Sequence, residues 1–187
     1  MNTMQFWTPW TITSRWVDWV IKCLDYTPYS QFKLQNVIFH IDTQGGDTVA
    51  TKRLIEKLLS LRNHVAVTTI ADTALSSGAL LFLAGENHCR HMYSGGSICL
   101  HGVSINMPVY MLGSDGRVPD EEWRKAVELN AWVEQFVRSR IADMSDDELL
   151  DRLRSPEGFV FDCYDGRRHG LVYQIFHAYK EQTFTGF

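Results

Sequence analysis

The chain has 187 residues, of which 45% are hydrophobic and 21% charged, and its formal net charge at pH 7 is -4. These values are typical of one globular domain spanning residues 1–187, and the negative charge argues against a nucleic-acid partner, which would bind through a basic face. The N-terminal segment lacks a signal-peptide pattern and no apolar run could cross a bilayer, so we expect no membrane association. Four cysteines without CxxC spacing indicate reduced thiols in a cytoplasmic protein.

The first half of the chain alternates between predicted strands and helices. Apolar spacing predicts helices over 14–24 and about 50–61, and an all-apolar run over 78–85 predicts a buried helix. Short apolar or β-branched runs predict strands at 4–7, 37–41, 65–70, 91–93 and 98–100. This alternation favours an α/β fold with a largely parallel sheet.

The second half is predicted to be mostly helical. A proline and an acidic first turn at 119–122 begin a helix that extends to about Ile141. Its apolar face is wide enough to predict burial on two sides, one of them against another subunit. Ser145 begins a capping box, and residues 170–173 are predicted to form a short strand that closes the domain.

Three segments carry residue types suited to acyl transfer. Ser76 begins the apolar helix, where the Ser77 amide and the helix dipole would stabilise negative charge. Gly45 and Gly46 follow a strand and could supply a second amide, and His101 ends a strand and could act as a general base. Each also has a plainer interpretation: a helix cap, a tight turn and a structural histidine.

Two rival chemistries are weaker. His88, Cys89 and His91 lack the spacing of a tetrahedral ligand set, so a surface turn is favoured and no metal or cofactor is predicted. Cys99 could be a nucleophile, but a buried strand cysteine is the usual case.

Taken together, the segments 41–47 (IDTQGGD), 74–85 (ALSSGALLFLAG) and 97–101 (SICLH) resemble the Clp protease proteolytic subunit, the ClpP family of serine peptidases. The resemblance extends from about residue 11 to about 173. It implies a crotonase-like spiral of ββα units with a handle at about 120–150. It also implies that Ser76 is the nucleophile and His101 the general base, with an oxyanion hole formed by the amides of Ser77 and of Gly45 or Gly46.

The resemblance also implies partners. Members of the family form homo-oligomeric stacked rings, and AAA+ unfoldases feed them unfolded protein. Only three residues precede the first predicted strand, which argues against such an unfoldase here. Asp47 and Gly102 would lie beside the substrate groove. Because Gln44 and Gly102-Val103 differ from the family's usual residues, we expect a different cleavage preference.

The third member of the catalytic triad is the weakest part of the pattern. Matching Gly170-Leu171-Val172 to the family places its aspartate near Gly158, which cannot orient a histidine. Glu157 is the predicted replacement. Asp162, Asp151 and a Ser-His dyad without an acid stay open.

The sequence therefore predicts a serine endopeptidase that cleaves peptides or unfolded protein through an acyl-enzyme. One alternative is a crotonase-type enzyme acting on acyl-coenzyme A thioesters. Another is a catalytically weak subunit of a mixed Clp ring.

Overall fold

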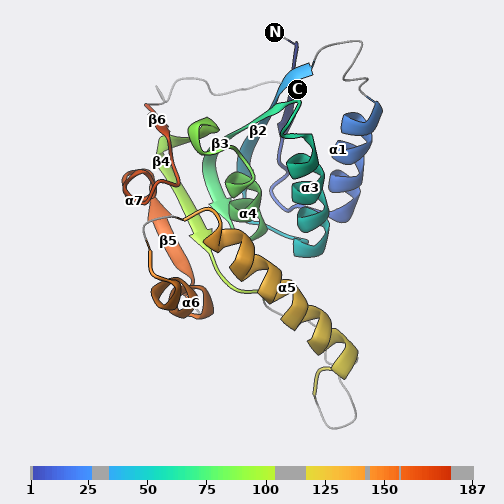
Figure 1. Ribbon diagram of the computed structural model, residues 1–187, viewed down its shortest axis with the longest axis vertical. Coiled ribbons are helices and arrows are strands. Elements are labelled where there is room, and N and C mark those ends of the chain that lie inside the picture. The colour runs from blue at the N-terminus through green and yellow to red at the C-terminus, as the bar shows by residue number, and fades with distance from the viewer. Residues whose placement is uncertain (1, 27–33, 104–116, 142–143, 156, 178–187) are drawn as a thin grey trace.

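A six-stranded, mostly parallel sheet organises the chain (Figure 1). The computed structural model describes residues 2–26, 34–103, 117–141, 144–155 and 157–177. Four parallel strands lie side by side: β1 (Asn2–Trp7), β2 (Leu34–Thr43), β3 (Ala66–Leu75) and β4 (Arg90–Leu100). Both remaining strands pair with β4, β5 (Phe159–Asp162) antiparallel and β6 (Gln174–Phe176) parallel. The predicted α/β class with a largely parallel sheet is confirmed.

Helices connect and cover these strands. Between the first four strands lie α1 (Ser14–Tyr26), α3 (Thr48–Leu61), α4 (Ser77–Leu83) and the 3-10 turn η1 (Asn87–Cys89). Helices α1 and α3 pack together, and α4 packs on α3 and on the sheet. Every residue of α4 is buried, as its continuous apolar sequence predicts. The later helices are α5 (Asp120–Arg138), α6 (Asp146–Arg154) and α7 (Cys163–Arg168).

Helix α5 projects away from the sheet (Figure 1). Its buried residues, Val133, Phe136 and Val137, all lie in its C-terminal half. In the other half Trp123 and Val127 are 60% and 50% exposed. The predicted helix is therefore confirmed, but in this chain only one end of its apolar face is covered. Residues 142–143 of the predicted handle lie outside the described residues.

The structure corrects several predicted elements. Strands β2 and β3 are longer than predicted, and the strands predicted at 91–93 and 98–100 form one strand, β4. The β3–β4 register shifts between Ala71, opposite Met92, and Thr73, opposite Ser97, which leaves a bulge in β4. Gly96 is required there, because a Cβ atom at this position would lie 2.5 Å from the Asp72 carbonyl oxygen.

The C-terminal strand was predicted too early in the chain. Residues 170–173 form a turn instead, in which the amides of Leu171 and Val172 both donate to the Gly166 carbonyl. The strand begins only at Gln174, and β5 and α7 were not predicted. No helix within the described ranges is long and apolar enough to cross a membrane.

Candidate active site

Ser76 lies at the junction of β3 and α4 in a strained backbone conformation. Its φ and ψ are 54° and -122°, and it is the one non-glycine residue with positive φ in the described part of the chain. Its side chain makes no capping hydrogen bond, so the hydroxyl does not serve as a helix cap. Its amide donates to the Cys99 carbonyl oxygen at 2.9 Å and fixes the junction against β4. Strain of this kind is concentrated at functional sites, where the surrounding structure enforces it.

Strand pairing brings His101 to the same edge of the sheet as Ser76. Leu75 pairs with Cys99 in the parallel β3–β4 ladder, so the two candidate residues follow neighbouring strand ends. Ser76 and His101 line one cavity of about 180 Å³. The other lining residues are Gly46, Thr48, Ser77, Leu80, Gly102, Val103 and Val133.

The His101 ring is half-buried and is oriented by the main chain. Its Nδ1 atom lies 2.6 Å from the Gly102 carbonyl oxygen. With a proton on Nδ1 donated to that carbonyl, Nε2 carries the lone pair that a general base needs. Among the described residues no hydrogen bond joins Ser76 to His101. Catalytic hydrogen bonds of this kind often shorten only when substrate binds.

The two candidate glycines have different roles. The Gly45 amide donates to Thr43 Oγ1 at 3.2 Å, and its carbonyl accepts from the Ile12 amide at 2.7 Å. The Asp47 amide donates to the Ile12 carbonyl at 2.9 Å, so this bridge leaves the Gly46 amide facing away from Ile12. Within the described ranges that amide has no hydrogen-bond partner. Gly46 is therefore the better oxyanion donor, a choice that the sequence left open.

Gly45 provides the space that Ser76 requires. A Cβ atom at Gly45 would lie 2.7 Å from the Ser76 Cβ and 2.8 Å from the Leu75 carbonyl oxygen. The φ of Gly45 is +102°, in the range that favours glycine. Gly45 thus allows the strand end of β2 to approach the serine.

Ser77 supplies the second available amide. It is the first residue of α4, so its N–H has no partner within the helix. No hydrogen bond to this amide is present among the residues that the structure describes. Gly46 and Ser77 both line the cavity that holds Ser76, so their amides are the candidate donors of an oxyanion hole.

Among the described residues, the predicted third triad residue, Glu157, makes no hydrogen bond or ion pair with His101. Glu157 lies in an exposed turn where its amide donates to Ser155 Oγ at 3.3 Å, and it lines neither cavity of this region. Asp162 caps α7 and Asp151 is an exposed residue of α6. The described contacts support none of these three as the orienting acid.

Gly158 is the residue that lies behind His101. A Cβ atom at Gly158 would be 3.1 Å from the His101 Cβ and 2.8 Å from the Leu100 carbonyl oxygen. The position that the resemblance assigns to the acid is therefore close to the histidine, but it has no side chain. The geometry fits a Ser-His dyad in which the Gly102 carbonyl orients the ring.

A second cavity of about 540 Å³ adjoins the site and shares His101, Gly102, Val103 and Val133 with it as lining residues. It lies between residues 101–103, α5 and the end of α6. Asn130 of α5 holds this segment, because its Oδ1 accepts from the Val103 amide at 2.6 Å and its Nδ2 donates to the Val103 carbonyl at 3.3 Å. From the other side the Gly102 amide donates to the Leu153 carbonyl at 2.8 Å. The role of Asn130 was not predicted, and its one signal in the sequence was an amide within an apolar helix face.

The predicted substrate-binding residues separate in the structure. Gly102 lines both cavities. Asp47 lines neither, and its carboxylate caps α3 by accepting from the Ala50 amide at 2.9 Å.

Cys99 is a poor nucleophile in this setting. Burial raises the pKa of its thiol, which disfavours the reactive thiolate at neutral pH. All four cysteines are free thiols.

No protein-family model matches the chain, and no curated protein sequence matches it significantly.

Proposed function

We propose that this chain is a serine endopeptidase with a ClpP-like fold that acts through a Ser-His dyad. The observation that carries the proposal is the 180 Å³ cavity in which Ser76, His101 and the amide-bearing residues Gly46 and Ser77 meet. A strained serine beside two main-chain donors that have no partner in the described part of the chain is suited to forming and stabilising a tetrahedral intermediate.

In the proposed reaction Ser76 Oγ attacks the peptide carbonyl carbon while His101 Nε2 takes the hydroxyl proton. The carbonyl oxygen gains negative charge and accepts hydrogen bonds from the Gly46 and Ser77 amides. His101 then gives the proton to the leaving amine, and an acyl-enzyme remains. Water hydrolyses the ester by the same steps, again with His101 as base.

The substrate is proposed to be an extended peptide. The larger cavity beside His101 would hold a side chain next to the scissile bond, and its apolar wall from Val127, Ala131 and Val133 favours an apolar one. Assembly into cytoplasmic stacked rings, with α5 as the handle, belongs to the same proposal. An AAA+ partner is not part of it.

An active-site probe tests the proposal directly. A fluorophosphonate should label the purified protein at Ser76, and Ser76→Ala should abolish both labelling and peptide cleavage. Cys99→Ala is the matched control, because it removes the other candidate nucleophile near the site and should leave labelling intact. Absence of labelling in a folded sample would overturn the proposal.

The two alternatives predict different results. A crotonase-type enzyme would bind acyl-coenzyme A, which calorimetry would detect, but no carboxylate lines the smaller cavity among the described residues. A catalytically weak subunit would leave Ser76 unlabelled until an active paralogue is added.

A further inference from the structure

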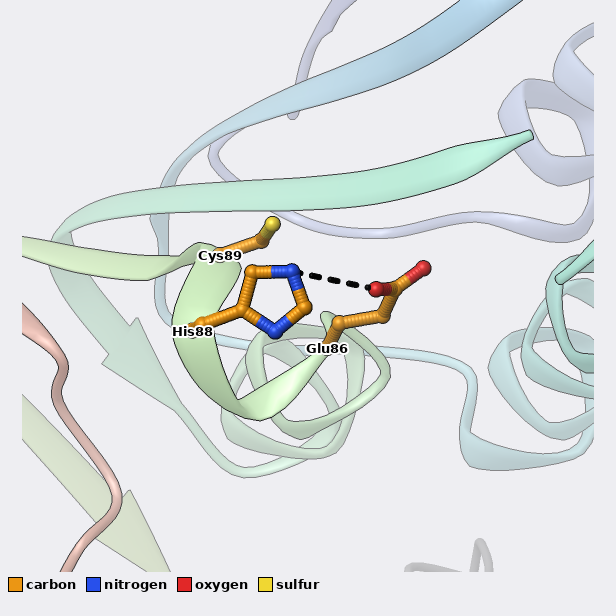
Figure 2. A group of neighbouring side chains, drawn as sticks. All are labelled: Glu86, His88 and Cys89. Carbon is orange, nitrogen blue, oxygen red and sulfur yellow. Dashed lines mark ion pairs between the residues drawn. The ribbon is translucent and has the colours of Figure 1, made fainter.

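A second group of reactive side chains lies at the opposite end of β4. Glu86, His88 and Cys89 each offer one ligand atom, and these three atoms lie within 4.8 Å of one another. Figure 2 shows the carboxylate, the imidazole and the thiol converging from the turn around η1. From the sequence, His88, Cys89 and His91 were predicted to form a surface turn. The cluster seen in the structure contains Glu86 in place of His91.

The cluster is separate from the proposed active site. Cys89 immediately precedes β4, whose first residue, Arg90, pairs with Thr69 of β3, whereas Ser76 follows the far end of β3. At about 3.3 Å per residue, the seven steps along the chain from Thr69 to Ser76 span roughly 23 Å. A ligand at this turn would not touch the reacting atoms of the proposed peptidase.

The turn that carries the three side chains is held in place by the main chain. The Glu86 amide donates to the Val67 carbonyl of β3 at 3.1 Å, and the Cys89 amide donates to the Glu86 carbonyl at 2.8 Å. Buried Arg90 donates to Asn87 Oδ1 at 2.8 Å. The backbone positions of the three residues are therefore fixed without a ligand, which lowers the entropy cost of binding one.

The contact between His88 and Glu86 brings two possible ligand atoms close together. His88 Nε2 lies 3.4 Å from Glu86 Oε2, as the dashed line in Figure 2 marks. A hydrogen on His88 Nε2 accounts for this contact in the metal-free chain, and a metal ion bound here would replace that hydrogen between the two atoms. Cys89, at the edge of the same space, adds a thiol, which a bound metal ion would deprotonate.

We propose that Glu86, His88 and Cys89 bind one zinc ion, with water in the fourth position. Imidazole, carboxylate and thiolate are the usual zinc ligands, with bonds of about 2.0–2.3 Å. A tetrahedral arrangement of such bonds separates the ligand atoms by about 3.3–3.8 Å. Side-chain rotations that move these atoms by about 1 Å would bring the three ligands to this separation. The carboxylate and the thiolate together neutralise the charge of the ion. The three ligands all belong to the turn at η1 and the residue before it, and the water position leaves the ion open to a further ligand.

Cobalt serves as the spectroscopic probe of this site. Metal-free, tag-free full-length protein should bind one equivalent of Co²⁺ and develop both a thiolate-to-cobalt charge-transfer band and intense tetrahedral ligand-field bands. Zn²⁺ should displace the cobalt and raise the melting temperature, because it binds the native state more tightly than the unfolded chain.

The variants assign the ligands. Cys89→Ser should abolish the charge-transfer band, and His88→Asn and Glu86→Gln should each weaken Zn²⁺ binding by at least about 100-fold, since losing even an outer partner of a ligand costs 10–100-fold. Cys23→Ser and His64→Asn, outside the cluster, should change neither spectrum nor affinity. If Cys89→Ser failed to fold, the His88→Asn and Glu86→Gln variants would still test the proposal, because these two side chains are partly exposed.

Two outcomes would overturn the zinc proposal. One is a cobalt spectrum without sulfur ligation, and the other is unchanged affinity in the His88 and Glu86 variants. Neither outcome affects Ser76 labelling, so the two proposals fail or succeed separately.

Discussion

The backbone at Gly158, beside His101, leaves little room for a side chain. Its φ is +69°, and three atoms lie within 3.3 Å of the position that a Cβ atom would take. We predict that Gly158→Ala lowers the free energy of unfolding by about 1–3 kcal/mol, from backbone strain together with crowding. Urea unfolding of the purified variant measures this change.

Gly170→Ala is the matched control for this prediction. Gly170 has the same φ of +69°, but a Cβ atom there would meet no other atom within 4 Å, so its substitution reports backbone strain alone. Gly158→Ala should therefore be the more destabilising of the two. Equal losses in both variants would show that crowding beside His101 contributes nothing.

His40 makes stability depend on pH. Burial lowers the pKa of its imidazole below the usual 6.5, and the ring stacks on Trp7 with centroids 4.7 Å apart. Below pH 6.5 the unfolded chain binds a proton that the folded chain resists, so stability is lost as the pH falls through this range. We predict that His40→Phe, which keeps a ring on Trp7, reduces this loss. Urea unfolding at pH 7.5 and 5.5 tests it, and an unchanged difference between the two pH values would contradict it.

Some residues of the candidate active site could be proposed from the sequence, and others could not. Ser76 and His101 stand at strand ends that local patterns identify. Distinguishing Gly46 from Gly45 needed the bridge to Ile12, a contact between residues far apart in sequence. The role of Asn130 depends on α5 packing beside Val103, which no local pattern encodes.

At the scale of elements, the start of α6 depends on one hydroxyl. Ser145 Oγ accepts from the Glu148 amide at 3.3 Å, which is one half of the predicted capping box, whereas the Glu148 carboxylate accepts from Arg152 at 2.9 Å. We predict that Ser145→Ala lowers the free energy of unfolding by about 1 kcal/mol. Ser60→Ala is the control, because Ser60 lies inside α3 and bonds back to the Lys57 carbonyl, where alanine favours the helix. A loss as large in Ser60→Ala as in Ser145→Ala would contradict the capping role.

Helices and central strands were easier to predict than the C-terminal elements. Helix α1 and helix α5 have long apolar periodicities, and both begin where the sequence indicated. Strand β5 has four residues and helix α7 has six, too few for a period to be distinguished from chance. The bulge in β4 interrupts its alternation, so a single strand was predicted as two.

For the whole molecule, the exposed end of α5 raises the question of assembly. Trp123 and Val127 are four positions apart and therefore lie on one face of the helix, where both are largely exposed in the isolated chain. Large apolar side chains grouped on a projecting helix are typical of an interface between subunits. This agrees with the proposed role of α5 as a handle between copies of the chain.

A charge on that face should prevent the assembly. We predict that the purified protein sediments as an oligomer and that Trp123→Glu shifts it to smaller species, because pairing α5 would then bury an unpaired carboxylate. Trp19→Glu is the matched control, since Trp19 is 53% exposed but lies on α1, and it should leave the sedimentation coefficient unchanged. A monomeric protein, or an oligomer that persists with glutamate at position 123, would show that this face of α5 does not mediate assembly. The peptidase proposal would then have to explain activity in an open site, because an enclosed chamber requires the subunits to associate.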